Sequence, residues 1–431
     1  MGTGIFGLAS AYHIKKNSPG KRVLAIDRFA DVAQGNTGRS NAMFRNMFTS
    51  GDNRELANAT IDFYTHVQRD MKVDIGVDPI GYLWLMSERQ LSTSSHHVDS
   101  MEENGVQVVR YGARDLGEMI PGLALNQAEK EESRLMNLED VAGAYFGPKC
   151  GRLAPEKLAR FYKERFLDLG GDLIFGADAK SLIVDATVPT GLEGEPFLWQ
   201  DSRVAGVRLS DGGEIRAATT VVAAGAWTNE LLDPTGIDGH AKSKMRQLFT
   251  VPAQSGSALA RLLHTKGFNP SGTIPFLILP KGGVIVKPMS EQAEFWVGGE
   301  DEVNRQFLAY PEEDIDANYP PERAYYEMSI HPVLRAYLPD FAGAGPSRMW
   351  SGLYSYNTVD NLPYVFEGDG LVVVGGDSGS GVMKGDSLGR VVDAVYRNGE
   401  ETEVELFGGA TYRASKLGFR KRDVEREDWL L

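Results

Sequence analysis

The spacing of three glycines at the start of the chain most constrains its fold. Gly2, Gly4 and Gly7 spell G-x-G-x-x-G directly before a segment with helical periodicity. In a dinucleotide-binding turn the first glycine permits a tight turn, the second lets the backbone approach a pyrophosphate, and the third lets the helix pack closely on a sheet. The positive end of the helix then faces the phosphates. We therefore predict a dinucleotide site at this turn.

The segment after the glycines carries the rest of the pattern. Apolar residues recur at helical spacing up to the Ser-Pro-Gly sequence at 18–20, which cannot easily continue a helix. A short apolar run at 23–26 follows and ends in Asp27, 20 residues after Gly7. A carboxylate at this place can bind the hydroxyl groups of the adenosine ribose. The glycines alone could form an ordinary turn, but the helix, strand and acid together favour the dinucleotide site.

One part of the usual pattern is missing. The glycine motif normally follows a buried strand, yet only Met1 precedes Gly2. We therefore expect that the natural chain begins several residues earlier. An intact mass equal to that of these 431 residues would contradict this expectation.

Length, charge and cysteine content limit the class of protein. The 431 residues are enough for two domains. The formal net charge of -14 argues against nucleic acid or an anionic membrane as the main partner. There is no apolar run long enough for a transmembrane helix. The single cysteine, Cys150, excludes an internal disulfide framework and suits a reducing cytoplasm, and the scattered histidines predict no metal site.

Patterns further along the chain predict alternating helices and strands, followed by an antiparallel region. Helices are expected at 53–71, 155–169, 331–339 and 382–396, and strands at 78–86, 172–175, 181–185, 204–209, 214–217, 220–224, 276–280, 284–288, 295–298 and 371–374. The last strand is a continuous apolar run, as expected of a buried parallel strand. It opens into the glycine-rich loop 375–381, and the helix after this loop would present free backbone donors there.

Two other stretches are less specific. The loop 35–45 is rich in hydrogen-bond donors, and it could wrap an anionic cofactor or simply be solvated. The mixed charges after residue 402 favour a solvated face or an interface element.

Several segments, taken in order, resemble one family. They are residues 2–12, Thr37-Gly38-Arg39-Ser40 with Arg45, Gly225-Ala226-Trp227, residues 350–354, residues 360–363 and residues 376–381. Together they resemble the FAD-dependent amine and amino-acid oxidoreductases of the glycine oxidase, sarcosine oxidase and D-amino-acid oxidase type. Within this family the chain is most similar to the sarcosine and dimethylglycine dehydrogenase branch, and the resemblance covers nearly the whole chain.

The resemblance implies an α/β architecture with α+β elements and two domains. A Rossmann-like FAD-binding domain would be assembled from 1–45, 140–235 and 345–400, a mostly antiparallel substrate domain from 46–139 and 236–344, and a C-terminal extension from 401–431. The flavin ring would lie between the two domains.

The resemblance also implies site residues. Arg45 falls where sarcosine oxidases carry an arginine for the substrate carboxylate, Lys384 lies next to a lysine position of those enzymes, and Tyr354 completes the candidate catalytic group. The implied cofactor-binding residues are Gly2, Gly4, Ile5, Phe6, Gly7, Asp27, Arg28, Thr37, Gly38, Arg39, Ser40, Ala224, Gly225, Trp227, Gly352, Gly376, Asp377, Gly379, Ser380 and Gly381. From the residues alone, Arg45 could instead bond loop carbonyls, Lys384 could be an exposed first-turn residue, and Tyr354 could belong to the core.

The implied reaction is oxidation of a small secondary amine or amino acid, such as an N-methyl or imino acid, by hydride transfer to FAD. The loop 376–381 and the helix after it would stabilise the negative charge that develops on the flavin. Ser380 stands where the family usually has a histidine. No cysteine lies near the C-terminal motifs and no histidine in the 35–45 loop, so we expect noncovalent FAD.

Two other functions remain open at this point. The chain could be an FAD-dependent dehydrogenase of a 2-hydroxy acid or a polyol phosphate, and an extra cationic cluster in the pocket would favour the phosphate. It could also be a noncatalytic flavin-binding subunit that acts in assembly of respiratory complexes, which an uncharged pocket and an exposed apolar patch would favour. A homo-oligomer and a hetero-oligomer are both possible. The sequence names neither the substrate nor the electron acceptor.

Overall fold

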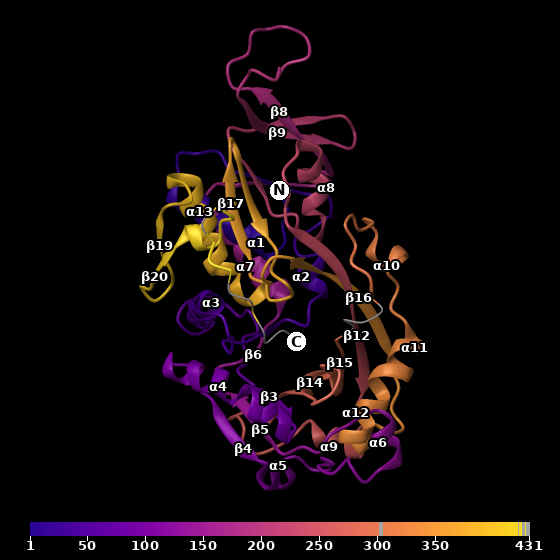
Figure 1. Cartoon of the computed structure of the whole chain (residues 1–431). Coiled ribbons are helices and arrows are strands. Elements are labelled where there is room, and N and C mark those ends of the chain that lie inside the picture. The colour runs from indigo at the N-terminus through magenta and orange to yellow at the C-terminus, as the bar shows by residue number, and fades with distance from the viewer. Residues whose placement is uncertain (301–304, 421, 425–426, 428–431) are drawn as a thin grey trace.

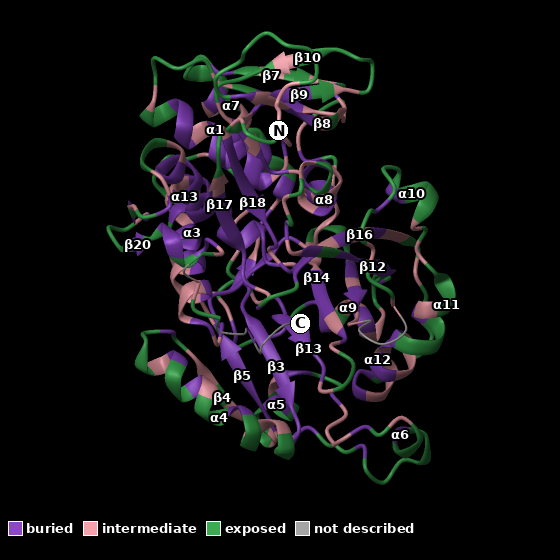
Figure 2. Ribbon diagram, turned by 45° about the horizontal axis from the view of Figure 1, so that its top comes forward, coloured by how far each residue is buried: buried purple, intermediate pink, exposed green. Residues whose placement is uncertain are grey.

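Figure 1 shows the computed structural model of the chain, which describes residues 1–300, 305–420, 422–424 and 427. An α/β region lies at one end, and a large sheet with its covering helices lies at the other. The strands at 82–86, 143–147 and 371–375 are completely buried, whereas the outer helices and the connecting loops carry most of the exposed residues (Figure 2). The mixed α/β class predicted from the sequence is confirmed.

Two short sheets form the centre of the α/β region. Their strands are β1 (Leu24–Asp27), β7 (Asp172–Phe175), β11 (Thr220–Val222), β17 (Tyr364–Gly368) and β18 (Leu371–Gly375). β1 pairs in parallel with β7, and β18 pairs in parallel with β11 and antiparallel with β17. The apolar run at 371–374 is therefore a buried parallel strand, as predicted.

Residues 1 and 2 connect these two sheets. The Met1 nitrogen donates to Val221 O over 2.8 Å, and Ala223 N–H donates to Met1 O over 3.0 Å. On the other side, Gly2 N–H donates to Ile26 O over 2.8 Å. The glycine turn is thus held between β1 and β11. In the dinucleotide-binding pattern, the strand that precedes the glycine motif occupies this position.

Three helices pack on these sheets, namely α1 (Ile5–Asn17), α7 (Pro155–Asp168) and α13 (Gly385–Asn398). α1 and α13 contact each other directly. A Cβ atom added at Gly389 would lie 2.7 Å from the backbone carbon of Ala9, and one added at Gly385 would lie 2.5 Å from Ile5 Cγ1. The contacts pair Gly385 with Ile5 and Gly389 with Ala9, so the two helices run parallel and their N-termini lie side by side.

The second region is built on an eight-stranded sheet with the order β16-β12-β15-β14-β13-β3-β5-β4. Its strands are β3 (Tyr82–Met86), β4 (Val109–Gly112), β5 (Gly143–Gly147), β12 (Ala241–Pro252), β13 (Phe276–Ile278), β14 (Ile285–Met289), β15 (Glu294–Gly298) and β16 (Arg348–Asn357). All neighbours are antiparallel except β13 and β3. Two segments that the sequence assigned to the FAD-binding domain, 140–235 and 345–400, also contribute strands to this sheet, because they contain β5 and β16.

The remaining elements surround the two regions. They are α2 (Asn36–Arg39), β2 (Met43–Phe44), α3 (Gly51–Arg69), α4 (Glu88–Glu103), α5 (Ala113–Met119), α6 (Glu131–Leu135), β6 (Gly151–Arg152), β8 (Ala179–Ala186), β9 (Ser202–Leu209), β10 (Glu214–Arg216), α8 (Thr228–Leu232), α9 (Ala258–Leu262), α10 (Ile315–Asn318), α11 (Arg323–Tyr325), α12 (His331–Tyr337), β19 (Glu403–Glu405) and β20 (Thr411–Arg413). The helices predicted at 53–71, 155–169 and 331–339 are confirmed as α3, α7 and α12. Within the described part of the chain, no helix is both long and apolar enough to cross a membrane.

Two predictions differ from the structure. β12 was not predicted as a strand, because its N-terminal half alternates Lys242, Lys244 and Arg246 with other residues instead of presenting an apolar face. The interpretation of the tail as a solvated face is wrong for Tyr412 and Leu417, which are 1% and 0% exposed and join the core around α1 and α13.

The contact between α1 and α13 predicts the effect of one substitution. Gly389→Ala should lower the free energy of unfolding by about 1–3 kcal/mol, because the new methyl group meets the backbone of Ala9. Urea denaturation followed by circular dichroism measures this loss. Gly51→Ala, at the start of α3, is the control, since its added Cβ would meet only the Arg54 guanidinium at 3.7 Å. Equal stability of the two variants would contradict the close packing.

Candidate active site

A large cavity lies between the α/β region and the eight-stranded sheet. Its empty volume is ≈ 1770 Å³, which includes the space open to solvent at its mouth. The predicted residues that line it are Gly4, Ile5, Phe6, Thr37, Arg39, Ser40, Arg45, Gly225, Trp227, Gly352, Tyr354, Asp377, Gly379, Ser380 and Gly381. Segments far apart in the sequence therefore meet at one cavity.

The N-terminus of α1 forms one end of the cavity. Two of its glycines allow close backbone contacts, since a Cβ at Gly2 would lie 2.3 Å from Ala223 O and one at Gly7 would lie 1.8 Å from Gly2 O. Gly4 caps the 13-residue helix without a side chain. Backbone donors and the helix dipole thus face open space, which fits the pyrophosphate of a dinucleotide.

Asp27 has a structural role in this turn. Its Oδ2 atom accepts hydrogen bonds from Thr3 N–H at 2.6 Å and from the Thr3 hydroxyl at 2.8 Å, and its Oδ1 atom accepts one from Phe29 N–H at 3.0 Å. The carboxylate therefore fixes the glycine turn to the end of β1. Binding of ribose hydroxyls by Asp27 stays a prediction.

The arginines near this end are engaged by protein groups. The Arg39 guanidinium forms a fork with Asp316, with both nitrogen–oxygen distances at 2.7 Å. Arg28 stacks over the Trp227 ring at 4.2 Å and donates to Glu313 O. Eight predicted site residues do not line the cavity directly, namely Gly2, Gly7, Asp27, Arg28, Gly38, Ala224, Gly376 and Lys384.

The loop after β18 forms a wall on the other side of the cavity. Asp377 Oδ2 accepts a hydrogen bond from Gly381 N–H at 2.9 Å, and burial raises the pKa of Asp377. At Gly379 the backbone lies against the Tyr354 ring, where an added Cβ would approach Cε2 to 2.2 Å. The loop ends at a short 3-10 turn (Val382–Lys384) that leads into α13, so the positive end of α13 points toward the cavity.

Lys384 lies directly behind this loop. Its side chain is 0% exposed, which rules out the alternative of an exposed first-turn residue. Nζ donates to Ser380 Oγ over 2.5 Å and lies 4.7 Å from the centre of the Phe48 ring. Burial lowers the pKa of Lys384 to about 7; the Arg45 charge adds to this, whereas Glu427 and Asp377 oppose it.

Arg45 lies on the cavity wall and contacts the same Phe48 ring as Lys384. It is 3% exposed, donates to the Met47 carbonyl and lies 4.0 Å from the Phe48 ring. Burial lowers the pKa of Arg45, and the Glu427 charge is the largest opposing effect. The two roles considered from the sequence are compatible, because Arg45 bonds a loop carbonyl and also lines the cavity.

Tyr354 and Arg246 face the cavity from the large sheet. Tyr354 lies on β16, and burial raises its pKa. Arg246 lies on β12, where its guanidinium is 5.3 Å from the Tyr354 ring and donates to the Tyr356 hydroxyl. The sequence analysis did not predict Arg246 as a site residue. The only signal in the sequence was the basic residue at every second position in the first half of β12.

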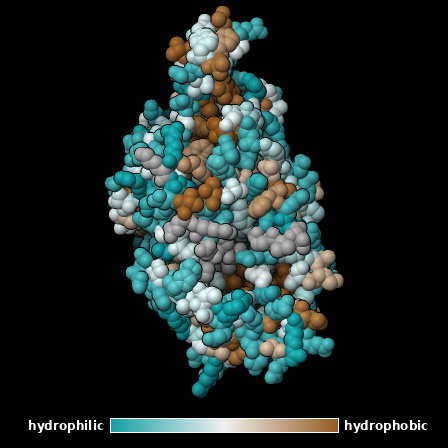
Figure 3. Space-filling view, in the orientation of Figure 1, coloured by the Kyte–Doolittle hydropathy of each residue, from teal (hydrophilic) through white to brown (hydrophobic). Residues whose placement is uncertain are grey.

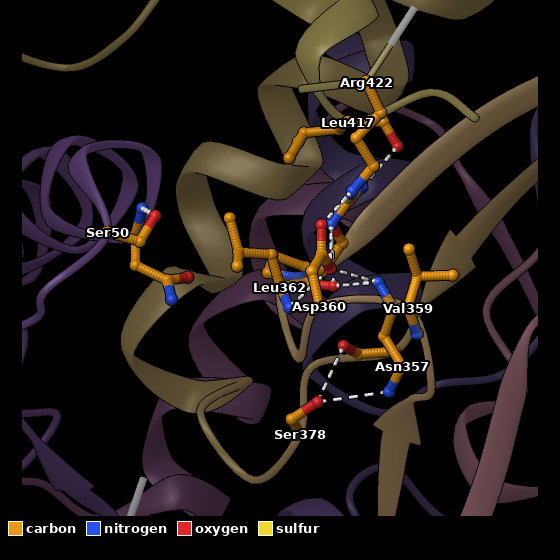
Figure 4. Close-up of polar contacts among 11 residues, drawn as sticks. Ser50, Asn357, Val359, Asp360, Leu362, Ser378, Leu417 and Arg422 are labelled. Atoms are coloured by element: carbon orange, nitrogen blue, oxygen red, sulfur yellow. Dashed lines mark hydrogen bonds and ion pairs between the residues drawn. The ribbon is translucent and has the colours of Figure 1, made fainter. Parts of the chain in front are cut away.

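One segment that resembles the family does not border the cavity as expected. Asp360 is buried and forms a double ion pair with Arg422, at 2.5 Å and 2.8 Å, while Asn357 Nδ2 donates to it over 2.8 Å (Figure 4). Asp360 is thus an internal structural residue, although the neighbouring Asn361 lines the cavity. Among the residues that the structure describes, no three His, Cys, Asp or Glu side chains gather to hold a metal ion.

The buried charge of Lys384 predicts a pH dependence of stability. Its pKa is about 7 in the fold and 10.5 as an unperturbed lysine, so the unfolded state binds more protons between these values. The free energy of unfolding should therefore rise with pH across this window. Lys384→Met should reduce that rise by about 1–3 kcal/mol between about pH 7.5 and 9.5, as measured by urea denaturation. Lys416→Met, at a half-exposed lysine, should leave the slope unchanged; an unchanged slope in Lys384→Met would contradict the burial of its charge.

Comparisons with known proteins agree with this site. Residues 1–394 match the family model of the FAD dependent oxidoreductases (DAO). The chain is 22% identical to "FAD-dependent oxidoreductase domain-containing protein 1" of Xenopus laevis, over 98% of this chain and 81% of that protein.

Solved structures share the fold. L-proline dehydrogenase from P. horikoshii superposes with a TM-score of 0.71 at 17% identity, covering 92% of each chain. Glycine oxidase from Geobacillus kaustophilus superposes with a TM-score of 0.68 at 20% identity, covering 96% of this chain and 97% of that one. The glycine turn, the cavity and the family match lead to one conclusion: the chain belongs to the DAO family of FAD-dependent oxidoreductases.

Proposed function

We propose that this enzyme oxidises a small amine or amino acid, with a secondary amine such as an N-methyl or imino acid as the preferred substrate. The observation that carries this proposal is the pair of buried cations, Arg45 and Lys384, at one end of the cavity. Similarity to an L-proline dehydrogenase and a glycine oxidase supports it, since both are named as enzymes of amino acids. The sarcosine-type branch suggested by the sequence is part of this proposal.

Arg45 is the proposed ligand of the substrate carboxylate. A guanidinium group presents paired donors that match the two carboxylate oxygens. The contacts of Arg45 with the Met47 carbonyl and the Phe48 ring fix its orientation before the substrate arrives. A preorganised donor of this kind loses little side-chain entropy on binding.

Lys384 is the proposed proton-exchanging group. An amine gives up hydride from its neighbouring carbon most readily when its nitrogen is neutral, so a nearby group must accept the ammonium proton. With a pKa near about 7, Lys384 can change protonation state at neutral pH. Its hydrogen bond to Ser380 Oγ, a residue of the cavity wall, links it to the cavity.

The cavity suits noncovalent FAD, with the α/β region as the proposed cofactor domain and the large sheet as the proposed substrate domain. Backbone donors at Gly4–Phe6 would hold the pyrophosphate, and the 379–381 loop with the positive end of α13 would lie at the flavin. Bound FAD supplies the two-electron acceptor for the hydride. No cysteine or histidine occurs among the described residues that line the cavity, which supports noncovalent binding.

Arg246 favours one alternative substrate class. As a further cation on the cavity wall, it is the feature that a phosphate-bearing polyol would need. The polyol phosphate dehydrogenase is therefore the second candidate function, and glycerol 3-phosphate belongs in any substrate panel.

The loop between β8 and β9 is a candidate surface for binding a partner protein. Leu198 and Trp199 are 105% and 71% exposed, and this loop projects from the end of the molecule as a tip on which hydrophobic and hydrophilic residues are mixed (Figures 1 and 3). Oligomer formation through this tip is compatible with the proposal, whereas the charged cavity argues against a purely noncatalytic subunit. The single buried Cys150 supports the expected reducing, cytoplasmic location.

Anaerobic reduction of the yellow protein tests the proposal. We expect L-proline or an N-methyl amino acid to bleach the flavin absorbance. In Arg45→Met the apparent second-order rate constant of bleaching should fall about 10²-fold or more, because the substrate carboxylate loses its ligand. Arg348→Met is the control, since that side chain is 66% exposed and pairs with Glu294; its rate should match the wild type. Bleaching by glycerol 3-phosphate alone, or equal rates in Arg45→Met and wild type, would contradict the proposal.

A further inference from the structure

The C-terminal tail is fixed at two points to residues that lie next to the cavity wall. The first is Arg422, which donates to Asp360 through Nε and Nη2 and also to the carbonyls of Leu362 and Pro363. The side chains of Arg422 and Asp360 are 3% and 0% exposed. Buried pairs of this kind hold a segment firmly, because separating them leaves an uncompensated charge.

Asp360 connects the tail to the cavity wall. Asn357 Nδ2 donates to Asp360 Oδ1 over 2.8 Å, and Asn357 N–H donates to Ser378 Oγ over 3.1 Å. Ser378 lies in the glycine loop and lines the cavity. Figure 4 shows Asn357 between Asp360 and Ser378, with Arg422 on the far side of Asp360.

The second point is Glu427, whose side chain sits at the N-terminus of α3. Oε1 accepts hydrogen bonds from Thr49 N–H at 3.1 Å and from the Thr49 hydroxyl at 2.7 Å. Oε2 accepts from Ser50 N–H and Asn53 Nδ2, both at 3.1 Å. The residue is 1% exposed, and Asn53 lines the cavity. Both oxygens are therefore fixed at the positive end of a 19-residue helix.

The Glu427 carboxylate accepts hydrogen bonds from Thr49, the residue after Phe48, and the Phe48 ring lies 4.0 Å from the Arg45 guanidinium and 4.7 Å from Lys384 Nζ. The fixed carboxylate therefore lies on the segment that contacts both candidate catalytic cations. Burial lowers the pKa of Arg45 and of Lys384, and in each case Glu427 is the largest effect that opposes burial. In return, Arg45 and the hydrogen-bonding residues Thr49, Ser50 and Asn53 at the start of α3 lower the pKa of Glu427, although its burial acts in the opposite direction.

Other groups contribute less to the charge balance. Asp377 opposes the lowering of the Lys384 pKa, and Arg45 adds to it. Tyr82, Cys150 and Tyr354 act on Arg45 more weakly than Glu427 does. Glu427 is thus the main counter-charge for this end of the cavity.

We propose that Glu427 is a positioning residue of the active site, delivered by the C-terminal tail to hold a fixed negative charge beside Arg45 and Lys384. This role rests on the proposed function of those two cations. It makes the tail part of the catalytic unit, because the electrostatic environment of both cations depends on a residue outside the sequence match to the family, which ends at residue 394. A purely structural role would instead confine Glu427 to capping α3.

Lysine titration distinguishes these roles. In the full, FAD-loaded chain labelled with ¹³Cε-lysine, the NMR signal of Lys384 is assigned by its loss in Lys384→Arg. Glu427→Gln should lower the pKa of Lys384 by about 1 pH unit or more, since an opposite charge nearby favours the protonated form. Asp423→Asn removes the same charge from an exposed position of the tail and should leave the titration unchanged.

A second variant keeps the test decisive if Glu427→Gln folds poorly. Glu427→Asp retains the charge, and the pKa of Lys384 should remain close to the wild-type value even if the melting temperature falls. An unchanged titration in Glu427→Gln, or an equal decrease in Asp423→Asn, would overturn the proposal. Because the titration needs no substrate, failure of the protein to oxidise any amine would count against the proposed function without affecting this result.

Discussion

Direct contact between α1 and α13 determines where the chemistry of this protein can take place. At Gly385 and Gly389 there is no side chain, so α13 approaches Ile5 and Ala9 closely and runs in the same direction as α1. The two glycine loops, one before each helix, therefore open into the same cavity with their helix dipoles directed to it. A cofactor bound there meets backbone donors from segments that lie more than 370 residues apart.

The cavity adds buried charge to this framework. Arg45 and Lys384 are removed from solvent and Asp377 is half-buried, which is costly unless each charge is balanced or hydrogen-bonded. The protein meets this requirement locally, through the Ser380 hydroxyl, the Gly381 amide, the Met47 carbonyl and the Glu427 carboxylate. The same balance leaves Lys384 able to change its protonation state near neutral pH, so stability and the proposed chemistry would depend on the same groups.

Local patterns in the sequence predicted a large part of this arrangement. The glycine turn, α1, the buried strand β18 and the α13 segment follow from short-range spacing, and the structure confirms each of them. The long strand β12 was missed because the side chains that face the cavity, such as Arg246, are polar and interrupt the alternation that identifies a strand. The polar side chains that line the cavity thus made β12 difficult to identify from the sequence.

Contacts between residues far apart in the sequence were the second limit on what the sequence could predict. The position of Asp27 predicted a ribose ligand, but its hydrogen bonds to Thr3 depend on how the turn folds back on β1. The pairing of Arg422 with Asp360 and the contact of Glu427 with α3 join residues 62 and 374 or more positions apart, which no local spacing reveals. For the same reason the tail was interpreted as a solvated face.

The most direct test of this account is a crystal structure of the FAD-loaded protein with pyrrole-2-carboxylate, a planar secondary amine that carries a carboxylate. The account predicts the pyrophosphate at the N-terminus of α1 and the ligand carboxylate on the Arg45 guanidinium, with Lys384 still bonded to Ser380. A carboxylate bound at Arg246 instead, or a flavin outside the cavity between α1, α13 and the large sheet, would contradict it.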